Sequence, residues 1–165
     1  FFFFLLASFL GIGAVAVVLV SDLKYYLIPD GAIFILFLLG GLAFFFRHRD
    51  AAIYALALDF GSTLVLSLFL VLLWFLSKGL WMGLGDGKLF FAVALLLGFP
   101  ANLSAFLFSF WLGSLAGGGL MLLGKKQLDG LMPFGPFILA GSILAFFWGE
   151  SFFSFTGLLY LFSAF

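Results

Sequence analysis

The stretch Trp81-Met82-Gly83-Leu84-Gly85-Asp86-Gly87-Lys88 places three glycines, an acid and a base in a chain that is otherwise nearly all apolar. A continuous hydrophobic run follows it at once. Glycines give the backbone unusual freedom and let another chain come close. Asp86 is therefore the first candidate for chemistry, although an aspartate at the start of a helix is also a good N-cap.

The composition indicates an integral membrane protein of the helical kind. Of its 165 residues, 66% are hydrophobic and 8% are charged, whereas soluble domains carry about 25% charged residues. The apolar runs are near-continuous, unlike the ~10-residue alternating segments of membrane barrels. Seven basic residues balance seven acidic ones, so no nucleic acid or other polyanion is expected as a partner. Without cysteine, disulfides, thiolate metal sites and cysteine nucleophiles are excluded.

The apolar runs predict an all-α, polytopic transmembrane helix bundle of about six spans, forming a single domain over residues 1–165. A span needs about 20 apolar residues. The first run lacks the basic flank and small-residue cleavage site of a signal sequence, so we count it as a span. The spans are expected at 1–20, 31–46, 51–76, 89–99, 103–123 and 133–148, with a partial seventh at 152–165.

Polar and proline-containing breaks separate these runs. The fourth span is expected to begin at or before Asp86, and Asp30 is well placed to cap the second. Residues 100–102 are expected to form a tight turn, and residues 149–151 to break the sixth run.

The number of predicted spans between the acids shows on which face of the membrane each one lies. Two predicted spans separate Asp22 from Asp86, and two more separate Asp86 from the loop 124–132, so all three lie on one face. The other face carries Arg47 and Arg49. The aspartate face carries five lysines: Lys24, Lys78, Lys88, Lys125 and Lys126. By the positive-inside rule the aspartate face is cytoplasmic.

Two aspartates on one face suggest aspartic proteolysis. In that chemistry one carboxylate takes a proton from the attacking water, and the other, protonated, donates to the substrate. Asp22 follows a span, where the helix macrodipole disfavours its charge, whereas Asp86 precedes one. The sequence thus predicts a protonated Asp22 and an ionised Asp86. No metal or cofactor is required, and the single histidine, His48, is expected to be solvated in the opposite loop.

Three segments carry a family resemblance: residues 22–30, with Ile-Pro-Asp at their end, residues 83–89, with Gly-x-Gly-Asp, and residues 133–137, Pro-Phe-Gly-Pro-Phe. In order and spacing they resemble the three signatures of the type IV prepilin peptidases, which are polytopic membrane aspartic proteases. The resemblance implies that Asp22 and Asp86 are catalytic. It also implies cleavage of the basic leader of prepilins or pseudopilins, just before their hydrophobic segment, at the cytoplasmic face of the bacterial inner membrane.

The resemblance covers the peptidase part only. Bifunctional members carry an N-terminal region with paired cysteines that methylates the new terminus, and no such activity is assigned to these residues. After the motif aspartate the family often has valine or phenylalanine, where this chain has Gly87.

The active-site loop or substrate groove is expected to include Gly83, Gly85, Lys88, Pro133 and Gly135. Lys88 either contacts a substrate carbonyl, steadies Asp86, or is a boundary lysine that extends to the interface. The Pro133 segment either walls a substrate groove or simply opens the sixth helix, where proline is ordinary and the second proline delays the start.

Asp59 lies deep in the third span, ~12 Å from its outer end, and a membrane carboxyl there is a functional candidate. We expect it to be neutral or paired inside the bundle, and we expect Arg47, Arg49 and Glu150 to be solvated. An ion-coupled transporter or channel is the alternative function, but it would need acids stacked through the membrane. A catalytically inactive homologue is the other alternative. The sequence predicts no oligomeric state.

Overall fold

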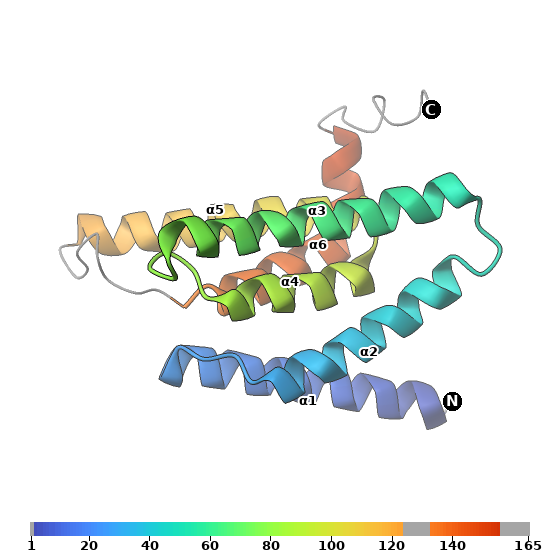
Figure 1. The fold of residues 1–165 in the computed structure, drawn as a ribbon, viewed down its shortest axis with the longest axis horizontal. Helices are drawn as coiled ribbons and strands as arrows, with labels where there is room; N and C mark the ends of the chain where they lie inside the picture. The colour runs from blue at the N-terminus through green and yellow to red at the C-terminus, as the bar shows by residue number, and fades with distance from the viewer. Residues whose placement is uncertain (1, 124–132, 156–165) are drawn as a thin grey trace.

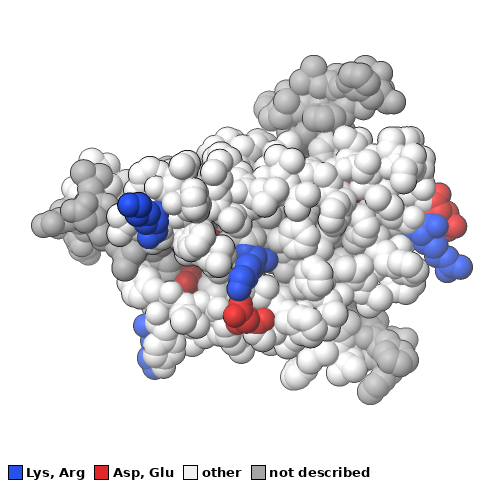
Figure 2. All heavy atoms as spheres, viewed as in Figure 1, with Lys and Arg blue, Asp and Glu red and all other residues white. Residues whose placement is uncertain are grey.

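The computed structural model describes residues 2–123 and 133–155, and all regular structure within these ranges is helical (Figure 1). The helices are α1 (Phe2–Tyr25), α2 (Asp30–Arg47), α3 (Ile53–Ser77), α4 (Leu84–Leu97), α5 (Ala101–Leu122) and α6 (Gly135–Phe155). Within these ranges α1, α2, α3 and α5 are long and apolar enough to cross a membrane. The prediction of an all-α membrane bundle is confirmed, and the face drawn in Figure 2 carries few charged side chains.

Helix α4 lies at the centre of the bundle. It contacts α2, α3, α5 and α6, and Figure 1 shows the α1–α2 pair on one side of it and α3 on the other. Most of its middle is apolar and covered: Leu89, Phe90, Ala92 and Ala94 are all fully buried. With 14 residues it is about 21 Å long. It therefore depends on its neighbours to position its first turn.

Several helix ends differ from those expected. Helix α1 continues to Tyr25, so Asp22 lies in its last turn and not after it. Helix α6 begins at Gly135 instead of Pro133, and it continues through 149–151 to Phe155, so the predicted break is wrong. A helical glycine costs only about 1 kcal/mol, and here the Ser104 hydroxyl donates to the Gly149 carbonyl at 2.9 Å.

Two further local predictions can be compared with the helix bounds. The connection lies at residues 98–100 and not at 100–102, because α4 ends at Leu97 and α5 already starts at Ala101. Most of the predicted seventh segment, and the loop with Lys125 and Lys126, lie outside the described residues.

Asp59 is paired, as expected, but with residues that were predicted to be solvated. Its carboxylate accepts from Arg47 Nη1 at 2.8 Å and from the Phe99 N–H at 3.0 Å, and His48 Nε2 lies 3.4 Å away. Arg47 also donates to the Leu96 carbonyl at 2.6 Å. The prediction of a solvated His48 is therefore wrong, whereas Arg47 is ion-paired and still one-third exposed. Together these contacts tie α2 and α3 to the end of α4 that lies away from Asp86.

Replacing Asp59 by alanine leaves the Arg47 guanidinium and the Phe99 N–H without their acceptor. Breaking a buried ion pair costs about 3–5 kcal/mol, and we expect roughly 3 kcal/mol of lost stability because the Arg47 side chain is one-third exposed. Thermal unfolding in detergent measures this. The matched control is Asp50→Ala, an exposed acid nearby, expected within about 0.5 kcal/mol of the native chain. Equal stability of the two variants would contradict the role given to Asp59.

Candidate active site

Asp86 sits in the first turn of α4, three residues after the N-cap Gly83. Its Oδ2 accepts a hydrogen bond from the Gly83 N–H at 2.9 Å, which is the acidic half of a capping box. Asp86 is therefore not the N-cap, which is Gly83, but its side chain caps the helix from the N3 position. A surface cap needs no burial, but only 5% of Asp86 is exposed. Capping alone does not account for so buried a carboxylate.

Asp22 sits in the last turn of α1 and is 4% exposed. Its Oδ2 accepts from the N–H of Gly135, the first residue of α6, at 2.9 Å. A Cβ at position 135 would lie 2.6 Å from that same oxygen. The start of α6 therefore reaches the carboxylate only because residue 135 has no side chain.

Both carboxylates consequently lie at helix N-termini, Asp86 at that of α4 and Asp22 at that of α6. The positive end of a helix dipole favours a negative charge. The sequence argument for a protonated Asp22 considered only the end of α1. The start of α6 offsets that effect, so helix dipoles do not decide which aspartate holds a proton.

Burial raises the pKa of Asp86 to about 7; the Gly83 N–H lowers it, and the negative charge of Asp22 raises it further. Removing a carboxylate from water disfavours its charged form. Asp86 lies outside the four helices long enough to cross a membrane. A pKa near neutrality lets Asp86 either hold or release a proton, so the assignment of the ionised member to Asp86 stays a prediction.

The two aspartates line one cavity of about 420 Å³, which we call the aspartate cavity. Gly83, Gly85, Lys88 and Pro133 also line it, and Gly135 bonds directly to Asp22. The structure thus brings every site residue predicted from the sequence to the same end of the bundle. It also shows lining residues that sequence reasoning missed: Tyr26, Ile28, Asp30, Trp81, Met82 and Phe134.

Asp30 is the most informative of the missed residues. The N-cap position of α2 belongs to Pro29, and no side chain caps this helix, so the predicted capping role of Asp30 is wrong. Its Oδ1 accepts from Lys88 Nζ at 2.9 Å. Asp30 closes the first signature segment, and that position was the signal that could have revealed it.

Gly87, which departs from the family pattern, has a packing role. A Cβ at this position would lie 2.7 Å from Val71 Cγ2. Helices α3 and α4 therefore approach closely one residue after Asp86. Among the described residues, no three histidine, aspartate or glutamate side chains gather in a way that would hold a metal ion.

These observations define a helical membrane protein with two buried carboxylates in one cavity. A profile of the type IV leader peptidase family matches residues 9–118, a range that includes both aspartates. The chain belongs to this family. No solved structure matches it.

Three curated proteins named prepilin leader peptidase/N-methyltransferase are similar to this chain. The Bacillus subtilis protein is 34% identical over 149 residues, covering 87% of this chain and 56% of that protein. The Legionella pneumophila protein is 32% identical over 150 residues, with coverages of 89% and 51%. The Aeromonas hydrophila protein is 35% identical over 135 residues, with coverages of 79% and 45%. The chain spans about half the length of these relatives.

Gly135→Ala forces a methyl group against the Asp22 carboxylate, so we expect a loss of about 1–3 kcal/mol, the usual cost of overpacking. Gly31→Ala is the matched control, because a Cβ there meets nothing within 4 Å, and alanine is the better helix former. Thermal unfolding in detergent should show the first variant destabilised and the second equal to or above the native chain. If Gly135→Ala were as stable as Gly31→Ala, the close contact would be disproved.

Proposed function

We propose that this chain is an aspartic endopeptidase that cleaves the leader peptide of type IV prepilins or pseudopilins. The observation that carries the proposal is that Asp22 and Asp86, buried and from separate helices, line one cavity. The charge of Asp22 acts on the Asp86 carboxyl, so the two form an electrostatically coupled pair. Membership of the type IV leader peptidase family supports the substrate class.

The pair supplies an acid and a base because it shares one proton. The ionised member takes a proton from water as the water oxygen attacks the scissile carbonyl, and the protonated member donates to the developing oxyanion. The carboxyl that took the water proton then gives it to the leaving amine as the C–N bond breaks, and the other carboxylate takes a proton from the gem-diol oxygen, so the pair again holds one proton. The N–H groups of Gly83 and Gly135 each hold one carboxylate in place. Their role is to position the two acids.

We place the chain in the bacterial inner membrane with the aspartate cavity facing the cytoplasm. Lys24, Lys78 and Lys88 belong to the loops and helix ends on the aspartate side, and Arg47 and Arg49 to the opposite side. Short basic loops remain in the cytoplasm. This orientation exposes the pair to a leader that has not crossed the membrane.

The transporter or channel alternative has little support, because Asp59, the acid deep in the third predicted span, already has hydrogen-bond partners within the bundle. Asp59 is bonded to Arg47 and to the Phe99 N–H. A carboxylate held by such partners anchors helices and is poorly suited to exchange an ion.

Co-expression with a prepilin tests the proposal. Asp22→Asn and Asp86→Asn keep an oxygen that accepts the Gly135 or Gly83 N–H but cannot act as acid or base. We expect each to lower processing by at least about 100-fold, while Asp50→Asn, at an exposed site, leaves it unchanged. Gel separation of precursor and mature prepilin measures this. Processing that survives either active-site substitution would exclude the two-aspartate mechanism.

The pKa of Asp86 predicts a pH dependence. Its folded pKa is raised to about 7, so a rise of pH above 7 removes the shared proton, and with it the acid. We expect the rate to fall towards tenfold per pH unit above that point. The pair titrates as a unit, so the profile reports both residues. The measurement is kcat against pH in detergent, with thermal unfolding at each pH as the control. A rate that stays flat between pH 7 and 9 contradicts the shared proton.

A further inference from the structure

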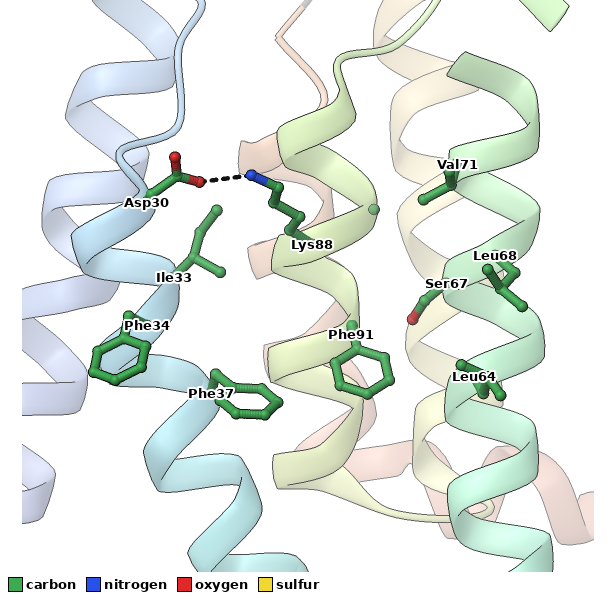
Figure 3. A pocket seen from close by; sticks show the side chains of 11 residues that line it. Asp30, Ile33, Phe34, Phe37, Leu64, Ser67, Leu68, Val71, Lys88 and Phe91 are labelled. Carbon is green, nitrogen blue, oxygen red and sulfur yellow. Dashed lines mark hydrogen bonds and ion pairs between the residues drawn. The ribbon is translucent and has the colours of Figure 1, made fainter. Parts of the chain in front are cut away.

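A second hollow, which we call the apolar groove, lies beside the aspartate cavity between α2, α3 and α4 (Figure 3). Its volume is about 390 Å³. Its walls are mainly aromatic and aliphatic side chains: Ile33, Phe34, Phe37, Leu64, Leu68 and Phe91. The hydroxyl of Ser67, which also lines it, is already bonded to the Thr63 carbonyl at 2.7 Å. The groove thus offers packing surface and little hydrogen bonding.

The apolar groove adjoins the aspartate cavity. Asp30 and Lys88 line both, and their ion pair stands at the head of the groove in Figure 3. The groove then follows α2 as far as Phe37, about 10 Å at 1.5 Å per residue. That length holds about two turns of a helix. Both members of the pair are substantially exposed, so it is a weak barrier between the two hollows.

The aspartate cavity and the apolar groove follow one another in the same order as the basic leader and the apolar segment of the proposed substrate. Asp30 is paired with Lys88, and one proton is shared by Asp22 and Asp86, so the lining of the aspartate cavity keeps one net negative charge, which suits a basic leader. The apolar groove begins where that cavity ends, just as the apolar segment of a prepilin begins where its leader ends. Apolar surface alone gains little from leaving lipid, so close packing must supply the attraction, and the three phenylalanines offer it.

We propose that the apolar groove holds the first two turns of the substrate's apolar segment while the adjoining peptide bond lies at Asp22 and Asp86. This inference rests on the proposed function. It assigns substrate positioning to Phe34, Phe37 and Phe91 and makes the groove a determinant of which leaders are cut.

Two leucines of α3 provide a matched test. Leu64 lines the apolar groove, whereas Leu72 lines the next hollow along α3, which borders the groove at Leu68 and Val71; their exposed fractions are 39% and 49%. Leu64→Trp fills the groove, so we expect about a tenfold rise in KM for a prepilin, with kcat little changed. Leu72→Trp should stay within twofold of the native chain. Equal processing by the two variants would overturn the proposal that the groove binds substrate. The same result is expected if lipid fills the groove.

Cross-linking separates this inference from the function on which it rests. The chain contains no cysteine, so Leu64→Cys and Leu72→Cys each create a single thiol, placed in the Asp86→Asn background to keep the substrate uncut. The probe is a prepilin with one cysteine in the first seven residues of its apolar segment. We expect a disulfide between the prepilin and the cysteine at position 64, and none with the cysteine at position 72. Equal cross-linking yields at the two positions would overturn the proposal that the groove binds substrate. If the native chain cuts no prepilin, the proposed function fails while the cross-link still decides whether the groove binds the segment.

Discussion

The hydrogen bond from the Gly135 N–H to the Asp22 carboxylate is the constraint on which the site depends. It joins α1 to α6 across 113 positions of the chain. A buried carboxylate is costly unless hydrogen-bond donors meet it, and here the donor is the first N–H of a helix, which has no partner within that helix. One contact therefore satisfies the acid, satisfies the helix end and fixes one wall of the aspartate cavity.

The two ends of α4 show how similar residues take different roles. At one end Asp59 is held by a guanidinium and a backbone N–H, with an imidazole close by. At the other end Asp86 is held, among the described residues, by the Gly83 N–H. A carboxylate with its charge fully compensated is an anchor. A carboxylate with one donor and a second acid nearby retains the capacity to exchange a proton.

The sequence predicted what depends on counting along the chain. Lengths of apolar runs place Asp22 and Asp86 on the same side, and the glycine-rich loop marks the start of α4. It did not predict what depends on packing between helices. The partner of Asp22 is a backbone group of α6, and the partner of Asp59 is Arg47, which looked like an ordinary loop residue. Asp30 resembled an N-cap because it follows Pro29 at the start of an apolar run. Only the position of α4 reveals its hydrogen bond with Lys88.

The close contact of Gly87 with Val71 has a consequence for how the family varies. A relative with a branched or aromatic residue after its motif aspartate cannot keep this interhelical spacing with a valine opposite. Either the residue facing it on α3 is smaller, or the two helices stand further apart. The positions equivalent to 71 and 87 should therefore change as a pair, and swapping one alone between relatives should push α3 and α4 apart beside Asp86.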